Sequence, residues 1–87
     1  MQKISAKDLY DKLQAEELQL IDDREVYEFT AGHISGAQNL PLSSLAENYG
    51  QLDKQIPYHI ICQKGGRSAR ACEFLEAKGY QVINVEG

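Results

Sequence analysis

The sequence has few of the residues that build metal sites and disulfide frameworks. Its 87 residues include only two cysteines, Cys62 and Cys72, and two histidines, His33 and His59. Two cysteines are too few for a disulfide scaffold, and these four residues show no C-x-x-C or H-x-x-x-H spacing. We therefore expect free thiols and no metal site.

Long apolar runs and an excess of positive charge are also missing. No stretch approaches the ~18 apolar residues of a membrane span, and the first twenty residues alternate charged and apolar side chains, unlike a signal-peptide core. Nine basic and thirteen acidic residues give a net charge of -4. This balance argues against nucleic acid or an anionic membrane as the main partner. We expect a cytoplasmic protein in a reducing compartment.

The composition that is present is typical of one small globular domain. Hydrophobic residues make up 43% of the chain and charged residues 25%. A chain of 87 residues leaves little room for a second core, so we expect a single domain over residues 1–87.

Short apolar runs alternate with helical patterns along the chain. Ser5 is a candidate N-cap with Asp8 three residues later, and Gly79 is a candidate helix-ending residue. The periodicity predicts helices from Ser5 to about residue 14 and over 26–31 and 67–78, a helical turn within 41–50, and strands over 18–21, 37–40, 58–62 and 80–85. This alternation predicts an α/β fold, a parallel sheet of about five strands with helices on both faces.

One loop combines several features that favour anion chemistry. It joins the clearest predicted strand to the longest predicted helix and consists of Cys62, Gln63, Lys64, Gly65, Gly66, Arg67 and Ser68. The glycines allow successive backbone N–H groups to face one cup, and the helix start adds its own N–H groups and positive dipole end. Two cations in the same loop favour a thiolate at Cys62 more than the reference pKa of ~8.5 allows.

A thiolate facing such a cup would attack an electrophilic sulfur, phosphorus or arsenic atom of an oxyanion. The alternative interpretation is a glycine turn between a strand and a helix with an incidental cysteine. The coincidence of cysteine, glycines, cations and helix start favours the functional interpretation.

Four motifs, in order, resemble the rhodanese family from about residue 4 to the end of the chain. Residues 20–25, LIDDRE, are similar to the family's L-[IL]-D-V-R-x motif, and residues 32–41, GHISGAQNLP, to G-H-I-x-G-A-x-[NH]-[IL]-P. The loop at 62–67 resembles the family's active-site loop, and residues 79–87 resemble its last strand.

The resemblance implies a sulfurtransferase whose nucleophile, Cys62, carries a persulfide during turnover. The backbone N–H groups of Gln63 to Ser68 would then bind the outer sulfur, with Arg67 closing the loop and Lys64 attracting thiosulfate or a similar anion. The implied acceptor is cyanide, a thiol or a protein cysteine, and no metal or organic cofactor is implied.

Two other functions stay open. The domain could be a sulfur-carrier or regulatory module of a larger fused protein. A phosphatase or arsenate reductase is the other, which the loop length disfavours: Cys62 and Arg67 enclose four residues, as in sulfurtransferases, whereas the related phosphatases have C-x5-R.

The chain departs from the family pattern at two points. Asp23 stands where the family more often has a small apolar residue, and no closing helix follows the last strand before Gly87. Either the chain is one part of a longer polypeptide or it functions without that helix.

For the second cysteine and the two histidines we expect structural rather than catalytic roles. Cys72 falls on the predicted buried face of a helix, His59 lies within a strand, and His33 occupies a turn where the resemblance implies a structural hydrogen bond. Glu28 could bond to the loop or be an exposed helix carboxylate. The acidic residues Asp22, Asp23 and Glu25 could weaken the attraction of the loop for anions.

Overall fold

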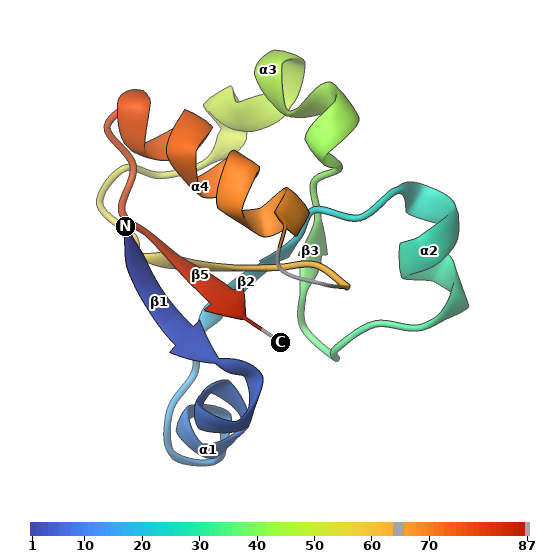
Figure 1. Ribbon diagram of the computed structural model, residues 1–87, viewed down its shortest axis with the longest axis vertical. Coiled ribbons are helices and arrows are strands. Elements are labelled where there is room, and N and C mark those ends of the chain that lie inside the picture. Colours follow the sequence, from blue (N-terminus) through green and yellow to red (C-terminus); the bar gives the residue numbers. More distant parts are fainter. Residues whose placement is uncertain (64–65, 87) are drawn as a thin grey trace.

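The computed structural model describes residues 1–63 and 66–86 and confirms the α/β fold (Figure 1). The strands are β1 (Gln2–Ser5), β2 (Gln19–Asp22), β3 (Gln38–Asn39), β4 (Tyr58–Ile61) and β5 (Val82–Glu86). The α-helices are α1 (Ala6–Ala15), α2 (Val26–Ala31), α3 (Leu45–Asn48) and α4 (Gly66–Ala77), and two 3-10 turns, η1 (Leu42–Ser44) and η2 (Tyr49–Gln51), flank α3.

All five strands are parallel, in the order β1-β5-β4-β2-β3. The strand β4 is therefore central, and all four of its residues are buried. Its neighbour β2 pairs with it in a register that sets Asp22 opposite Ile61. The carboxyl ends of these two strands consequently meet at one edge of the sheet, which is where open α/β sheets place their sites.

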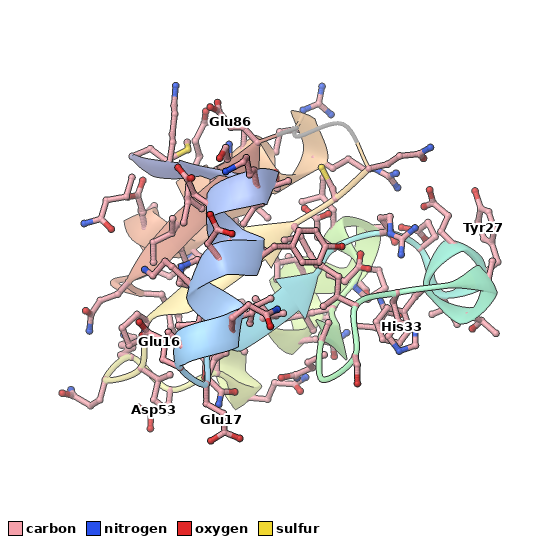
Figure 2. All side chains as sticks on the ribbon, turned by 90° about the horizontal axis from the view of Figure 1, so that it is seen from below. Glu16, Glu17, Tyr27, His33, Asp53 and Glu86 are labelled. Atoms are coloured by element: carbon pink, nitrogen blue, oxygen red, sulfur yellow. The ribbon has the colours of Figure 1, made fainter. Side chains whose placement is uncertain are left out.

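Each face of the sheet packs against its own layer of helix, as Figure 1 shows for α1 on one face and α3 and α4 on the other. On the α1 face, Leu9 packs with Leu20, Ile61 and Val85. The larger core lies on the opposite face, where buried residues of α4 meet those of the strands; it consists of Ile21, Leu40, Leu45, Leu52, Tyr58, Ile60, Ala71, Cys72, Leu75, Tyr80 and Val82. By contrast, α2 buries no residue, and Tyr27 points away from the sheet (Figure 2).

Local sequence signals explain the start of α1 and the end of α4. The Ser5 hydroxyl accepts a hydrogen bond from the Asp8 N–H at 3.1 Å, as the capping pattern predicts. At the end of α4, Gly79 has a φ of 91°, a left-handed conformation that glycine adopts without strain. The following Tyr80 N–H returns to the Leu75 carbonyl at 3.0 Å, which closes the helix.

The sequence did not predict β1 as a strand. Its residues are mostly exposed, so they show no apolar alternation, and pairing with β5 rather than burial defines the strand. Otherwise the observed bounds differ from the expected ones by at most two residues, and Cys62 lies just after β4 instead of within it. No helix within the described ranges is long and apolar enough to cross a membrane.

The α4 face of the sheet should supply much of the stability. Leu75 is fully buried in the larger core, so Leu75→Ala should lower the free energy of unfolding by about 2–5 kcal/mol. Glu73→Ala on the exposed side of the same helix should change it by less than about 0.5 kcal/mol. Urea unfolding of both variants checks this, and equal small changes would contradict the assignment of α4 to the core.

Candidate active site

Cys62 lies at the carboxyl end of the central strand, half-buried, with α4 beginning four residues later. The end of β2 fixes this position from one side, because the Asp23 N–H donates to the Ile61 carbonyl at 3.0 Å. Lys64 and Gly65, which the sequence assigns to the same loop, lie outside the described residues. Gly66 and Arg67, the first two residues of α4, line one cavity together with Cys62.

Ser68 connects the start of α4 both to Cys62 and to the sheet. Its N–H donates to the Cys62 Sγ at 3.3 Å, and its hydroxyl donates to the side-chain oxygen of Asn84 on β5. Both Ser68 and Asn84 are buried, so this side-chain hydrogen bond is shielded from water. A backbone N–H directed at the sulfur stabilises negative charge on it, which is what a reactive cysteine requires.

Arg67 is held by an ion pair with α2. Its guanidinium donates two hydrogen bonds to Glu28, at 2.6 Å to Oε1 and 2.9 Å to Oε2. This pair lowers the pKa of Glu28 to about 2 and raises the pKa of Arg67 above its usual range. Of the two interpretations of Glu28 from sequence, bonding to the loop side is therefore the one observed. The charge of Arg67 is largely neutralised, and the residue joins two segments that lie 39 positions apart.

Removing the charge of Glu28 should change stability in acid. Because the folded-state pKa of Glu28 lies below its usual 4.5, the ion pair contributes stability above about pH 4.5 and loses it as the pH falls toward about 2. Glu28→Gln should therefore show a shallower loss of unfolding free energy over this range than the wild type. Urea unfolding at several pH values measures it, with Glu73→Gln as the exposed control; an unchanged acid slope in Glu28→Gln would contradict the ion pair.

The acidic residues next to the site are mostly paired. Asp22 is buried and accepts three hydrogen bonds from the Arg24 side chain, at 2.9 to 3.1 Å, while Arg24 also donates to the Gly32 carbonyl at 2.7 Å. Glu25 accepts hydrogen bonds from the Ser43 hydroxyl at 2.9 and 3.0 Å. Because these two carboxylates are already bound by Arg24 and Ser43, they weaken the attraction of the loop for anions less than the sequence suggests.

Asp23 is the exception among these acidic residues. It is fully buried, and neither carboxyl oxygen has a hydrogen-bond partner within the described part of the chain. Burial, opposed in part by the nearby Arg67 charge, raises the pKa of Asp23 to about 7. The residue that departs from the family pattern therefore carries only part of a negative charge at neutral pH.

The raised pKa of Asp23 should make the protein less stable as the pH rises from about 4 to about 7. Over this range the folded state retains a proton that the unfolded state has released, and a shift from 3.8 to about 7 corresponds to up to about 4 kcal/mol. Asp23→Asn should remove this slope, whereas Asp11→Asn on the surface should keep it. The comparison of variants separates Asp23 from His59, whose lowered pKa acts with the opposite sign. Identical slopes in Asp23→Asn and wild type would contradict the assignment.

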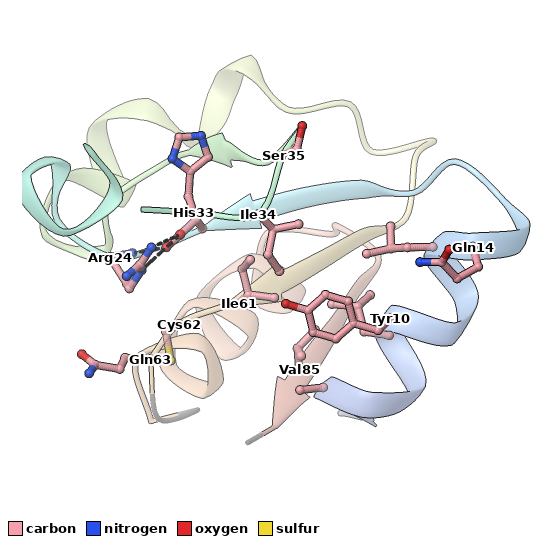
Figure 3. Close-up of a pocket in the computed structure, with 14 residues that line it drawn as sticks. Tyr10, Gln14, Arg24, His33, Ile34, Ser35, Ile61, Cys62, Gln63 and Val85 are labelled. Atoms are coloured by element: carbon pink, nitrogen blue, oxygen red, sulfur yellow. Dashed lines mark hydrogen bonds and ion pairs between the residues drawn. The ribbon is translucent and has the colours of Figure 1, made fainter. Parts of the chain in front are cut away.

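Two open cavities meet at Cys62 and Gln63. The smaller, about 480 Å³, is also lined by Gly66, Arg67 and Arg70, and we call it the basic cavity. The larger, about 610 Å³, lies between α1 and the segment that follows α2, as the close-up in Figure 3 shows. Its walls are mainly apolar and include Leu9, Tyr10, Leu13, Ile34, Ile61 and Val85. Cys62 is thus accessible from two chemically different sides.

The other reactive side chains considered from the sequence are buried or held by contacts within the fold. Cys72 is fully buried on the core-facing side of α4, and burial raises the pKa of its thiol to about 12. His33 stacks on Phe29 with ring centroids 3.7 Å apart and bonds to the Phe29 carbonyl at 2.8 Å. His59 is buried on the α1 face, and burial lowers its pKa. No group of three or more His, Cys, Asp or Glu residues that could hold a metal ion occurs within residues 1–63 and 66–86.

The structure brings together every predicted site residue that it describes. Cys62, Gln63, Gly66 and Arg67 line the basic cavity, and Ser68 bonds to Cys62. Sequence reasoning missed Arg70, which follows Arg67 by three positions and so shares its side of the helix. That spacing could have identified it.

The comparisons with known proteins establish the family. A family model described as Rhodanese-like domain matches residues 5–87, and the chain belongs to this family. The chain is 39% identical over 88 aligned positions to YtwF of Bacillus subtilis, a provisionally named sulfurtransferase, covering 100% of this chain and 85% of that protein. It is 33% identical over 85 residues to the thiosulfate sulfurtransferase GlpE of Shewanella oneidensis, covering 97% and 84% of the two chains.

A solved structure agrees with the fold. The Staphylococcus saprophyticus protein SSP1007 superimposes with a TM-score of 0.95 at 35% identity, over 100% of this chain and 88% of that one. Together with the names of the two relatives, this similarity places the chain among the sulfurtransferase-type members of the rhodanese family.

Proposed function

We propose that the protein transfers sulfane sulfur through a persulfide on Cys62, with thiosulfate as donor and a thiol or cyanide as acceptor. The observation that carries this proposal is the hydrogen bond from the Ser68 N–H to the Cys62 Sγ, at a point where two cavities meet. A sulfur atom held in this way is both charge-stabilised and accessible. Cys72 offers neither property, because it is fully buried.

In the first step, the Cys62 thiolate attacks the sulfane sulfur of thiosulfate. A bond forms between Sγ and that sulfur, the sulfur–sulfur bond of thiosulfate breaks, and sulfite leaves with its electron pair. The backbone N–H groups of Gln63 and of Gly66 to Ser68 bind the negatively charged outer sulfur, helped by the positive end of the α4 dipole. The parts proposed for Lys64, as a cation that attracts the donor, and for Gly65 stay predictions from the sequence.

In the second step, the acceptor attacks the outer sulfur of the persulfide. The bond between this sulfur and Sγ breaks, and Cys62 regains its thiolate electron pair. A thiol yields its own persulfide and cyanide yields thiocyanate, so neither step requires an external oxidant or reductant. Arg67 contributes by holding the loop against Glu28 rather than by reaching the sulfur.

Intact-mass spectrometry after incubation with thiosulfate tests this function. The wild type should gain the mass of one sulfur atom and lose it on addition of cyanide. Cys62→Ser should gain nothing, while Cys72→Ser, the matched control for the second cysteine, should gain sulfur like the wild type. A gain in Cys62→Ser would show that the nucleophile is misassigned.

Turnover measurements separate the proposal from the two alternatives. A free-standing enzyme should form thiocyanate continuously from thiosulfate and cyanide, whereas a carrier module should be loaded once and turn over slowly with small acceptors. A wild type that gains no sulfur but hydrolyses an aryl phosphate would contradict sulfur transfer and support the phosphatase alternative.

A further inference from the structure

The basic residues around Cys62 differ in whether their charge is already paired. Arg67 gives two hydrogen bonds to Glu28, and Arg24 is bound to the carboxylate of Asp22. A guanidinium held by a carboxylate in this bidentate way has little net charge to offer a ligand. The two arginines whose positions the motifs emphasise are therefore poor candidates for binding a free anion.

Arg70 is different. It lines the basic cavity with Cys62, Gln63, Gly66 and Arg67, and it is exposed on the second turn of α4. Within residues 1–63 and 66–86, no carboxylate lies within ion-pair distance of its guanidinium. Its charge is therefore available in a cavity of about 480 Å³ that Cys62 also lines.

We propose that Arg70 binds the anionic end of the sulfur donor and makes the protein selective for donors that carry such a group. This assignment rests on the proposed function and extends it. Thiosulfate has two negative charges, and the sulfite that leaves keeps both. A cation placed on the side of the leaving group stabilises the donor as it approaches the thiolate and the sulfite as it forms.

The second, larger cavity supports an approach of the donor from the side of Arg70. Although it also reaches Cys62, its walls are mainly apolar, and its arginine, Arg24, is bound to Asp22 (Figure 3). Moving a dianion against apolar walls removes its hydration without compensation. The anionic donor is therefore expected on the Arg70 side, which leaves the apolar side for the acceptor.

Alkylation of Cys62 with a charged and a neutral reagent tests the anion site without any sulfur chemistry. Iodoacetate carries a carboxylate and iodoacetamide does not, while both alkylate the same thiolate. The ratio of their rate constants cancels any change in the thiolate fraction. Arg70→Gln should lower the iodoacetate-to-iodoacetamide ratio about fivefold at low salt, which corresponds to about 1 kcal/mol. The difference should shrink at high ionic strength.

Three further variants make the alkylation test specific. Arg70→Lys keeps the charge and should preserve the ratio within about twofold, whereas Arg70→Glu should lower it further than Arg70→Gln. Lys7→Gln removes one positive charge from an exposed position on α1 that borders neither cavity, and it should leave the ratio unchanged. A ratio in Arg70→Gln equal to that in Lys7→Gln overturns the proposal.

The rate of persulfide formation from thiosulfate completes the test. In Arg70→Gln it should fall by at least the factor seen with iodoacetate, while the iodoacetamide rate changes little. A fall no larger than that of the iodoacetamide rate overturns the assignment of Arg70 to the donor. Failure of the proposed function gives a different result. In that case the wild type takes up no sulfur from thiosulfate, although its alkylation ratio still depends on residue 70. That result would also overturn the assignment of Arg70 to the sulfur donor.

Discussion

The junction between the end of β4 and the start of α4 is the constraint on which the site depends. Ser68 holds this junction through hydrogen bonds from its N–H to the Cys62 sulfur and from its hydroxyl to Asn84 on the neighbouring strand. Both residues of the side-chain pair are buried, so the start of the helix is fixed relative to the sheet. This junction directs the Ser68 N–H at the Cys62 sulfur.

The ion pair between Arg67 and Glu28 adds a second attachment, and it changes how the site's charges are understood. It connects α4 to α2, a helix that buries none of its own residues. It also pairs the charge of Arg67, the arginine of the loop motif, so the electrostatic attraction for anions depends on other groups. Among the described residues, Arg70 has the position and the unpaired charge for that role.

Much of the fold could be predicted because its signals are local. The Ser5 cap, the glycine that ends α4 and the apolar run of β4 each depend on residues close in sequence. The exposed strand β1 could not be predicted in this way, since it is defined by pairing with β5 at the other end of the chain.

In the site, too, local features could be predicted from the sequence and long-range contacts could not. The loop from Cys62 to Ser68 is recognisable because its cysteine, glycines and cations are contiguous. The partner of Arg67 is 39 residues away, and sequence alone left Glu28 between two interpretations. Asp23 is likewise fully buried in the fold, which an acidic side chain does not suggest. Long-range contacts therefore decide which charges at the site are available.

The central claim is that sulfur travels on Cys62, and peptide mapping after thiosulfate treatment tests it most directly. Trypsin should separate Cys62 from Cys72, because Lys64, Arg67 and Arg70 lie between them in the sequence. Tandem mass spectrometry should then find the added sulfur on the peptide that contains Cys62 and none on the peptide that contains Cys72. Sulfur on the Cys72 peptide, or on neither, would contradict the claim.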